Sequence, residues 1–362
     1  MQEIHLQSIG LMSGTSLDGL DVCCSTFHRK ADGKWSFHID AARGYTYPDP
    51  LKEKLGAGAQ QMSALEFITF HSAYGRFLGE RVNDFLAEFE VHPDLIASHG
   101  HTIFHEPQKR VMFQIGDGAA IAAQTHLPVV SDFRRLDIML GGQGAPLVPI
   151  GDRLLFGDYS YCLNIGGFSN ISMEWNGQRV AFDVSPVNYV INHYCRSIGL
   201  EFDRDGEIAR RGTVCLPLLE ELNALDFYHR TGPKSLGREW VETVIYPLLE
   251  RYPLTMEERL RTFYEHAACQ IARVLERYPV QSGACTLLVT GGGAFNRFLV
   301  ERIEALCACR MVIPDRRTIE YKEALIFALL GVLYMTDQRG CLASVTGASE
   351  DNIGGMLFKC GR

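Results

Sequence analysis

The feature that most limits the possible fold is one local arrangement that the chain contains twice. An apolar strand, a turn of small residues and a second apolar strand follow one another over 8–24 (SIGLM, SGTSLDG, LDVCC). The same order returns over 161–175 (YCLNI, GGFSN, ISMEW). Asn176-Gly177 then predicts a type I′ turn into a further strand, RVAFD. Two similar α/β domains, each with its own glycine turn, are the simplest explanation of this repetition.

Helical patterns alternate with these strands. Ser63 with Glu66, and Thr255 with Glu258, predict capping boxes at the starts of two long amphipathic helices. A third helix, over 319–335, is apolar on nearly all sides and is expected to be buried between layers. The alternation of strands and helices favours an α/β architecture.

The length of 362 residues favours two domains, because single hydrophobic cores rarely grow beyond about 250–300 residues. We expect an N-terminal domain over 1–131, completed by 337–362, and a C-terminal domain over 132–336.

Composition argues against some binding partners and cellular compartments. A formal net charge of −8 argues against nucleic acid as the main ligand. No stretch reaches the ~20 apolar residues of a membrane-spanning helix, and the first residues do not resemble an export signal. The eleven cysteines form no CxxC pair. We therefore expect a cytoplasmic protein, no membrane partner, and thiols that are reduced rather than disulfide-bonded or bound to a structural metal.

The glycine turns do not fit the common nucleotide motifs. SGTSLDG lacks the Gly-Lys-Ser/Thr of a P-loop and leads into a strand. GGGAFN (291–296), which follows the strand TLLVT, lacks the G-x-G-x-x-G spacing. Turns rich in hydroxyls, glycines and a carboxylate suit phosphoryl transfer, in which backbone donors and Mg²⁺ hold the phosphates.

Such a reaction needs a base. The candidate carboxylates are Asp18, Asp132, Asp137, Asp183, Asp203, Asp205 and Glu323. Asp183 is the best placed, because it ends the strand RVAFD and a carboxylate there can accept a proton from water or a hydroxyl. The alternative is that Asp183 caps a turn or helix, and the residues taken alone favour that alternative.

Several motifs together resemble one family. SGTSLDGLD, SHGHTIFHEP, VSDFRRLD, GGQGAPLVP, LNIGGFSNIS, FDRDG, GPKSLGRE and TGGGAFN occur in the order found in the 1,6-anhydro-N-acetylmuramic acid kinases. The resemblance covers about 9–350. It implies two RNase-H-like (actin-like ATPase) domains around a nucleotide cleft.

The implied activity is that of an ATP-dependent kinase. It opens the 1,6-anhydro ring of 1,6-anhydro-N-acetylmuramic acid with water and phosphorylates O6, giving N-acetylmuramic acid 6-phosphate in the recycling of cell-wall amino sugar. FDVSPVN (182–188) is similar to the family's F-D-x-G-P-G-N motif, which implies that Asp183 is the base after all.

The resemblance also implies binding residues. The ATP phosphates and adenosine would lie against Ser13, Gly14, Thr15, Ser16, Leu17, Asp18, Gly19, Asn164, Gly166, Gly167, Gly291, Gly292 and Gly293. Asp18 would hold Mg²⁺ through water. The amino sugar would contact Arg134, Arg135, His99, Asn188 and Glu323. For Arg135 an ion pair is an equally good interpretation. The resemblance also leaves a homodimer as one of the expected states.

Two departures from the family pattern bear on the substrate. Ser185-Pro186-Val187 replaces Gly-Pro-Gly after the base, and His101 and Phe104 replace a Gln and an Arg. We expect His99, His101 and the neighbouring His105 to be hydrogen-bonded histidines rather than metal ligands. A related sugar kinase with another substrate, or a catalytically weak sugar or nucleotide sensor, remain the alternative functions.

Overall fold

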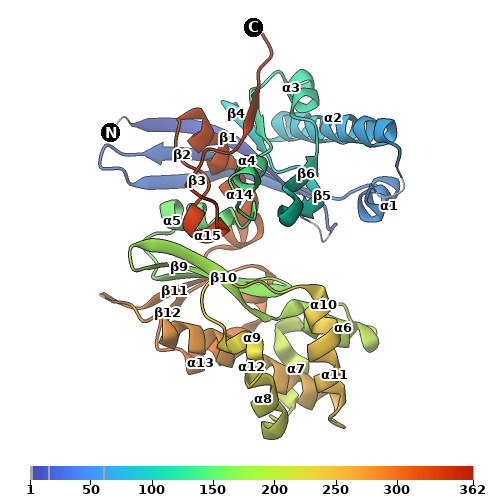
Figure 1. Cartoon of the computed structure of the whole chain (residues 1–362), viewed down its shortest axis with the longest axis vertical. Coiled ribbons are helices and arrows are strands. Elements are labelled where there is room, and N and C mark those ends of the chain that lie inside the picture. Colours follow the sequence, from blue (N-terminus) through green and yellow to red (C-terminus); the bar gives the residue numbers. More distant parts are fainter. Residues whose placement is uncertain (1–2, 15–16, 60–61, 282, 362) are drawn as a thin grey trace. The chain divides into compact units, whose positions relative to one another are not determined.

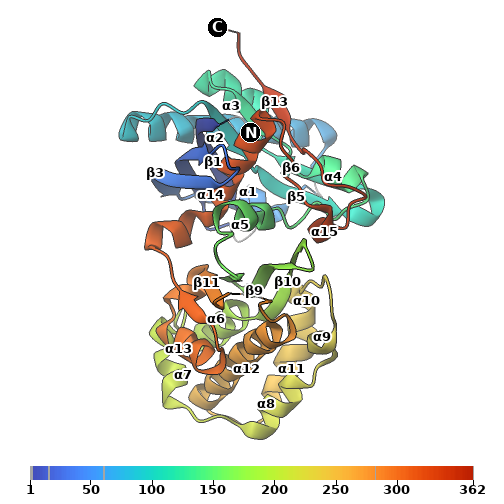
Figure 2. The same ribbon diagram turned by 90° about the vertical axis from the view of Figure 1, so that its left-hand side faces the viewer.

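The computed structural model describes residues 3–14, 17–59, 62–281 and 283–361 (Figures 1 and 2). The chain divides into two compact units. Unit 1 comprises Met1–Leu155 with Tyr321–Arg362, and unit 2 comprises Phe156–Glu320.

Unit 1 is built on a six-stranded sheet with the order β13-β7-β4-β1-β2-β3. Its strands are β1 (Ile4–Ser13), β2 (Leu20–Arg29), β3 (Trp35–Tyr45), β4 (Leu95–Ser98), β7 (Val129–Ser131) and β13 (Met356–Phe358). β1 pairs antiparallel with β2, which confirms the first predicted hairpin, and parallel with β4. A separate ribbon joins β5 (His101–Glu106) to β6 (Val111–Ile115).

The sheet of unit 1 is covered on both faces. Its helices are α1 (Asp49–Ala57), α2 (Ala64–Phe89), α3 (Gly118–Thr125), α4 (Arg135–Met139), α5 (Val148–Leu155), α14 (Arg316–Met335) and α15 (Ala343–Thr346), with a 3₁₀ turn at Pro107–Lys109. Side chains alternate along β1, so Ile9 and Leu11 join the core beneath α2 while Gly10 faces α14. A Cβ at Gly10 would lie 1.8 Å from the carbonyl oxygen of Ala324, so only glycine allows α14 this close.

Unit 2 repeats the topology of unit 1. Its sheet has the order β10-β9-β8-β11-β12, with antiparallel pairs at β8–β9 and β9–β10 and parallel pairs at β8–β11 and β11–β12. The strands are β8 (Tyr161–Ile165), β9 (Phe168–Trp175), β10 (Gln178–Pro186), β11 (Thr286–Thr290) and β12 (Arg310–Val312). In unit 1, β3-β2-β1-β4-β7 have the same order and directions. The repetition read in the sequence is therefore a repeated fold of the RNase-H-like kind.

The helices of unit 2 surround one hydrophobic core. They are α6 (Asn188–Ser197), α7 (Glu207–Arg211), α8 (Leu216–Asn223), α9 (Asp226–His229), α10 (Arg238–Trp240), α11 (Tyr246–Glu250), α12 (Met256–Arg277) and α13 (Arg297–Leu306), with 3₁₀ turns at Arg204–Gly206 and Gly292–Phe295 and a π-helical turn at Val241–Ile245. The turn at Asn176-Gly177 has φ of 51° and 77°, as the predicted type I′ turn requires.

The predicted helix starts are confirmed. Ser63 and Glu66 form both hydrogen bonds of a capping box at α2, and Thr255 and Glu258 do so at α12. The apolar helix predicted over 319–335 is α14, whose residues from Ala324 to Leu330 are buried.

The unit boundaries differ from those expected from the sequence. Residues 132–155 and 321–336, which we expected in the C-terminal domain, belong to unit 1. The cause is packing: α14 lies against β1 at Gly10, and a Cβ at Gly151 of α5 would lie 2.4 Å from the side chain of Ile326 in α14. The sequence showed that α14 is buried but not which sheet it covers.

One pair of cysteines contradicts the expectation of reduced thiols. Cys285 and Cys309 form a disulfide. Thr286 of β11 pairs in parallel with Arg310 of β12, and this pairing places Cys285 and Cys309, which directly precede them, side by side. A separation of 24 residues gave no sign of this contact. In the described part of the chain, no helix is long and apolar enough to cross a membrane.

Candidate active site

The first glycine turn of unit 1 is anchored by Ser13, the last residue of β1. Tyr47 donates a hydrogen bond of 2.7 Å to the Ser13 hydroxyl, and His101 Nδ1 lies 2.9 Å from the same oxygen. Tyr74 continues this series of hydrogen bonds, because its hydroxyl lies 2.9 Å from that of Tyr47. Burial lowers the pKa of His101, so the neutral ring is favoured. The Ser13 side chain is thus committed to the interior of unit 1.

The other described residues of this turn differ in exposure: Asp18 is exposed, whereas Gly14, Leu17 and Gly19 are partly buried. Leu17 has a φ of 60°, its N–H donates to the Gly14 carbonyl over 3.3 Å, and Asp18 is exposed. Gly19 has a φ of 155°, and a Cβ there would lie 2.5 Å from the Tyr45 carbonyl oxygen, so glycine is required for this approach. Two predicted phosphate-binding residues, Thr15 and Ser16, lie outside the described residues.

His99 and Arg134, both predicted to bind sugar, contact each other in unit 1. His99 Nδ1 donates to the Gly100 carbonyl over 2.8 Å, so Nε2 is the acceptor for Arg134 Nη2 at 3.0 Å. Burial and then the charge of Arg134 hold the pKa of His99 well below its usual value, so the ring is neutral. Arg134 also donates to the Gly144 carbonyl over 2.8 Å. Burial lowers the Arg134 pKa to about 10, opposed by the nearby carboxylate of Glu323, whose side chain is exposed on α14.

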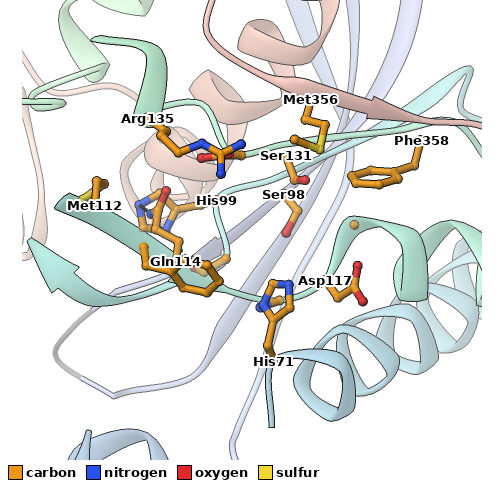
Figure 3. Close-up of a pocket in the computed structure, with 15 residues that line it drawn as sticks. His71, Ser98, His99, Met112, Gln114, Asp117, Ser131, Arg135, Met356 and Phe358 are labelled. Atoms are coloured by element: carbon orange, nitrogen blue, oxygen red, sulfur yellow. Dashed lines mark hydrogen bonds and ion pairs between the residues drawn. The ribbon is translucent and has the colours of Figure 1, made fainter. Parts of the chain in front are cut away.

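A small pocket in unit 1 contains two of the predicted sugar-binding residues, His99 and Arg135 (Figure 3). Its volume is about 130 Å³. Arg135 pairs with Asp132 over 2.7 Å but remains about half exposed. The hydroxyl of Ser98 also lines the pocket, is fully buried, and has no hydrogen-bond partner among the described residues. A buried hydroxyl beside an accessible guanidinium suits a carboxylate or another small anion.

Asp137, one of the candidate bases, is saturated with hydrogen bonds. It is completely buried in unit 1. One oxygen accepts from Thr346 at 2.7 Å, Cys341 at 3.0 Å and Asn352 at 3.2 Å, and the other accepts from the Gly144 N–H at 2.8 Å. These contacts join the segment after β7 to the C-terminal residues. Asp137 therefore has a structural role.

A second candidate base, Asp203 of unit 2, has a similar role. Its carboxylate accepts from the N–H groups of Ile208 and Ala209 at 2.9 and 3.2 Å, and from the Tyr264 hydroxyl at 3.1 Å. A carboxylate that accepts the first N–H groups of a helix is a cap. Asp203 thus caps α7.

The glycine turn of unit 2 holds the loop that follows the predicted base. The Gly167 carbonyl accepts from the N–H groups of Val187 at 2.8 Å and Tyr189 at 3.1 Å, and the Gly166 carbonyl accepts from that of Asn188 at 3.2 Å. The first turn of α6 is therefore docked on Gly166-Gly167. This brings together predicted residues that are more than 20 positions apart in the sequence.

The third glycine run closes on the end of β8. A Cβ at Gly291 would lie 2.6 Å from Asn164 Oδ1, and one at Gly293 would lie 2.2 Å from the Ile165 side chain. A Cβ at Gly292 would have the amide nitrogen of Asn188 3.9 Å away. Glycine is required at 291 and 293 by this approach, while Gly292 has room. Asn164, Asn188 and the three glycines thus form one cluster in unit 2.

Asp183 lies at an irregularity in β10, where its pairing with Asn170 of β9 is followed by a register shift before Ser185. The segment after α9 runs beside it. Asp183 N–H donates to the Lys234 carbonyl over 3.0 Å, and the Leu236 N–H donates to Asp183 Oδ2 over 2.8 Å. Among the described residues, no hydrogen bond reaches Oδ1. Burial raises the pKa of Asp183, opposed by the Leu236 N–H and Lys234.

The departures from the family pattern at 185 and 187 lie in the interior of unit 2. Val187 is fully buried in the hydrophobic core. Ser185 is also fully buried, and its carbonyl accepts from the Ser169 hydroxyl over 3.0 Å. Neither side chain points into open space next to Asp183.

Several contacting residues were not identified from the sequence. Lys234 and Leu236 act through their backbone, for which the only signal was the motif GPKSLGRE. Tyr47 and Tyr74 contact Ser13 across long sequence separations and had no signal. All three histidines are hydrogen-bonded, as expected: His99 and His101 make the contacts given above, and His105 Nε2 lies 2.8 Å from the Gln143 carbonyl.

Comparison with known proteins gives a family match over nearly the whole chain. The family model described as anhydro-N-acetylmuramic acid kinase matches residues 6–360.

Solved structures show weaker similarity. The activator of the 2-hydroxyisocaproyl-CoA dehydratase from Clostridium difficile, with bound ADPNP, has 12% identity and a TM-score of 0.42, covering 90% of this chain and 93% of that one. The ROK family glucokinase from Streptomyces griseus, with glucose and AMPPNP, has 10% identity and a TM-score of 0.40, covering 90% and 98%. The hexokinase from Schistosoma mansoni, with glucose, has 10% identity and a TM-score of 0.37, covering 90% and 85%.

Proposed function

Because this chain belongs to the anhydro-N-acetylmuramic acid kinase family, and is therefore an ATP-dependent kinase that opens the 1,6-anhydro ring and phosphorylates O6, we propose that Asp183 is its general base. One observation carries this assignment. The Leu236 N–H holds one oxygen of Asp183, and no hydrogen bond from the described residues reaches the other, whereas Asp137 and Asp203 are occupied by structural donors. Burial, which raises its pKa, also improves it as a proton acceptor.

The step that Asp183 serves is addition of water to the anomeric carbon. Asp183 takes one proton from water, the water oxygen bonds to C1, and the C1–O6 bond breaks. The freed O6 then bonds to the γ-phosphorus of ATP while the bond from phosphorus to the ADP oxygen breaks. The products are N-acetylmuramic acid 6-phosphate and ADP, and the proton leaves Asp183 for solvent.

Each unit, taken by itself, contains a glycine turn to which we assign contacts with ATP. In unit 1 the Ser13 side chain is engaged with Tyr47 and His101, so we assign the phosphate contacts of this turn to its backbone rather than to that hydroxyl. In unit 2 the cluster of Asn164, Asn188 and Gly291–Gly293 provides close backbone approach.

Mg²⁺ fits the residues at the first turn. Asp18 is an exposed carboxylate, and Mg²⁺ typically takes one or two carboxylates together with phosphate oxygens and water. Bound there, the ion would neutralise charge on the phosphates.

The amino sugar would place its lactyl carboxylate in the pocket of unit 1. Arg135 supplies a guanidinium, and Ser98 supplies a hydroxyl that has no hydrogen-bond partner in the described part of the chain. The volume of about 130 Å³ is below the roughly 300–1,000 Å³ of sites for whole small molecules, so we assign only this substituent to it. His99 and Arg134 would hold the wall of this pocket.

The primary test is product formation. We would incubate the protein with Mg-ATP and 1,6-anhydro-N-acetylmuramic acid and expect, by mass spectrometry, a product heavier by one water and one phosphoryl group. Replacing the sugar with glucose or N-acetylglucosamine tests the alternative of another substrate. Faster turnover of either would overturn the assignment, and ATP binding without any turnover would favour the sensor.

The lactyl assignment has its own test. Arg135→Gln should raise KM for 1,6-anhydro-N-acetylmuramic acid about tenfold while leaving KM for 1,6-anhydro-N-acetylglucosamine, which lacks the lactyl group, within twofold. Arg196→Gln, an exposed arginine of α6, is the matched control. An equal rise for both sugars would contradict the assignment.

The cytoplasm, where ATP is available, is the compartment that we propose for this reaction. A homodimer is also proposed, on the resemblance to the family alone. Light scattering of the purified chain tests it, and a monomer mass at working concentration would exclude it.

A further inference from the structure

Unit 2 contains a second pocket, of about 430 Å³, between the segment after α9 and the C-terminal half of α12. Phe182 and Val184 of β10 form part of its lining, and Lys234 and Gln270 contribute polar groups. Its volume is within the roughly 300–1,000 Å³ typical of sites for small molecules. None of the roles proposed for ATP or the amino sugar uses it.

The lining is strongly basic although the chain carries a net charge of −8. Arg230, Lys234, Arg273 and Arg277 all line the pocket, against one acidic residue, Glu276. Three of these cations donate to backbone carbonyls: Lys234 to Phe227 at 3.0 Å, Arg273 to Asn223 at 3.1 Å and Arg277 to Arg230 at 3.3 Å.

No described carboxylate forms a salt bridge with any of the four cations. Elsewhere in unit 2, Arg210, Arg251 and Arg302 each pair with a glutamate. Four gathered cations with one acidic residue in the lining repel one another, and an anion with several oxygens relieves that repulsion. The ammonium of Lys234 is additionally held over the ring of Phe227 at 4.4 Å and is half-buried, so it is a fixed rather than a freely moving charge.

The aromatic part of the lining suggests what the anion is attached to. Tyr228 and Tyr278 line the pocket together with Phe182. The Tyr228 hydroxyl lies 2.9 Å from His266 Nε2, and the Gln270 amide nitrogen donates to Asn223 Oδ1 over 2.6 Å, so the aromatic rings are what this side of the lining presents. Aromatic rings beside a cluster of cations suit an anion that is attached to a ring, such as a sugar, better than a purely inorganic ion.

The pocket is connected to Asp183 through a short backbone segment. The side chain of Lys234 lines the pocket, while its carbonyl accepts from the Asp183 N–H and Leu236, two residues on, donates to the Asp183 carboxylate. A ligand that moves or fixes Lys234 therefore acts on the segment that orients Asp183.

We propose that this pocket is a regulatory site for a phosphorylated sugar, whose phosphomonoester is bound by Arg230, Lys234, Arg273 and Arg277. Occupancy acts on turnover through the segment Lys234–Leu236. The effect on turnover rests on the proposed role of Asp183, whereas binding does not.

Binding is tested by isothermal titration calorimetry with glucose 6-phosphate, glucose and inorganic phosphate as probes, without ATP or amino sugar. We expect glucose 6-phosphate to bind more tightly than phosphate, and glucose not to bind. The double variant Arg273→Gln/Arg277→Gln should bind glucose 6-phosphate at least tenfold more weakly, while Arg196→Gln, outside the pocket, should bind it as the wild type does. Affinity unchanged in the double variant, or no binding to the wild type, would overturn the site. Phosphate binding as tightly as glucose 6-phosphate would overturn the sugar part of the proposal.

Coupling is tested by turnover at saturating Mg-ATP and amino sugar. Glucose 6-phosphate should lower kcat at least twofold in the wild type and leave that of Arg273→Gln/Arg277→Gln unchanged. Binding without a change in kcat would overturn the regulatory effect. A chain that binds the probe but has no kinase activity would instead contradict the proposed function, so the two failures are distinguishable.

Discussion

Each unit has a carboxylate in one of the motifs that resemble the family, Asp137 in unit 1 and Asp183 in unit 2, and the two carboxylates are held in opposite ways. In unit 1, DFRRLD places Asp137 in the interior, where four donors from distant parts of the chain occupy both oxygens. In unit 2, FDVSPVN places Asp183 at the edge strand, where one N–H fixes one oxygen. Full satisfaction makes a carboxylate a structural link, whereas partial satisfaction with burial leaves it able to accept a proton.

The largest effect should come from breaking the structural carboxylate. Asp137→Ala leaves the buried groups of Thr346, Cys341 and Asn352 without their acceptor and should lower the free energy of unfolding by about 3 kcal/mol or more. Urea denaturation measures this. The folded fraction should keep the wild-type kcat, and a variant that is as stable as the wild type but inactive would reverse the comparison.

The reactive carboxylate should be visible in the dependence of rate on pH. Because the pKa of Asp183 is raised, kcat should fall tenfold per pH unit below that raised pKa, at a pH above the ordinary range of an aspartate. An acidic limb at or below the ordinary aspartate pKa would contradict the role of burial.

The same shift has a consequence for stability. The folded state binds the Asp183 proton more tightly than the unfolded state does. The free energy of unfolding therefore decreases as pH rises from the unfolded-state pKa of Asp183 through its raised folded-state pKa. Asp183→Asn should therefore be more stable than the wild type at neutral pH, as thermal unfolding would show. A less stable variant would indicate that Asp183 is a structural link like Asp137.

The anchor of the first glycine turn should have an intermediate effect. Ser13→Ala removes the hydroxyl that joins Tyr47 to His101 and should destabilise unit 1 by about 1–2 kcal/mol, because both buried partners lose a hydrogen bond. It should also raise KM for ATP more than it lowers kcat. Ser13→Thr, which keeps the hydroxyl, is the control, and equal effects of the two substitutions would show that the hydroxyl is irrelevant.

The smallest effect should come from the remote hairpin of unit 2. Gly177 has a φ of 77°, and a Cβ added there would have none of the described neighbouring atoms within 4 Å. Gly177→Ala should therefore cost about 1 kcal/mol of stability from backbone strain alone. Kinase activity should not change. A large loss of activity would mean that the β9–β10 hairpin, rather than the Lys234–Leu236 segment, positions Asp183.

The fold was largely predictable because its signals are local. The two hairpins, the Asn176-Gly177 turn and both capping boxes depend on residues within a few positions of one another. The unit boundaries at 155 and 321 could not be predicted, because α14 is apolar on nearly all sides and its pattern does not indicate which sheet it covers. The disulfide of Cys285 with Cys309 depends on strand pairing and was missed for the same reason.

For the site, sequence could nominate carboxylates but not distinguish among them. Asp137 and Asp183 both lie in motifs that resemble the family, DFRRLD and FDVSPVN. The two carboxylates differ in the number of their hydrogen-bond donors. Asp137 accepts from Cys341, Thr346 and Asn352, whereas Asp183 accepts from the Leu236 N–H. These contacts span 53 to 215 positions, so no local pattern reports them.

The central claim, that the Asp183 carboxylate is the base, is tested most directly by the turnover of Asp183→Asn with 1,6-anhydro-N-acetylmuramic acid and Mg-ATP. Asparagine keeps the size of the side chain and an oxygen for the Leu236 N–H. We expect kcat to fall about 10²–10⁴-fold, with the affinities for ATP and sugar, measured by calorimetry, within threefold of the wild type. A kcat within tenfold of the wild type, at unchanged affinities, would contradict the account.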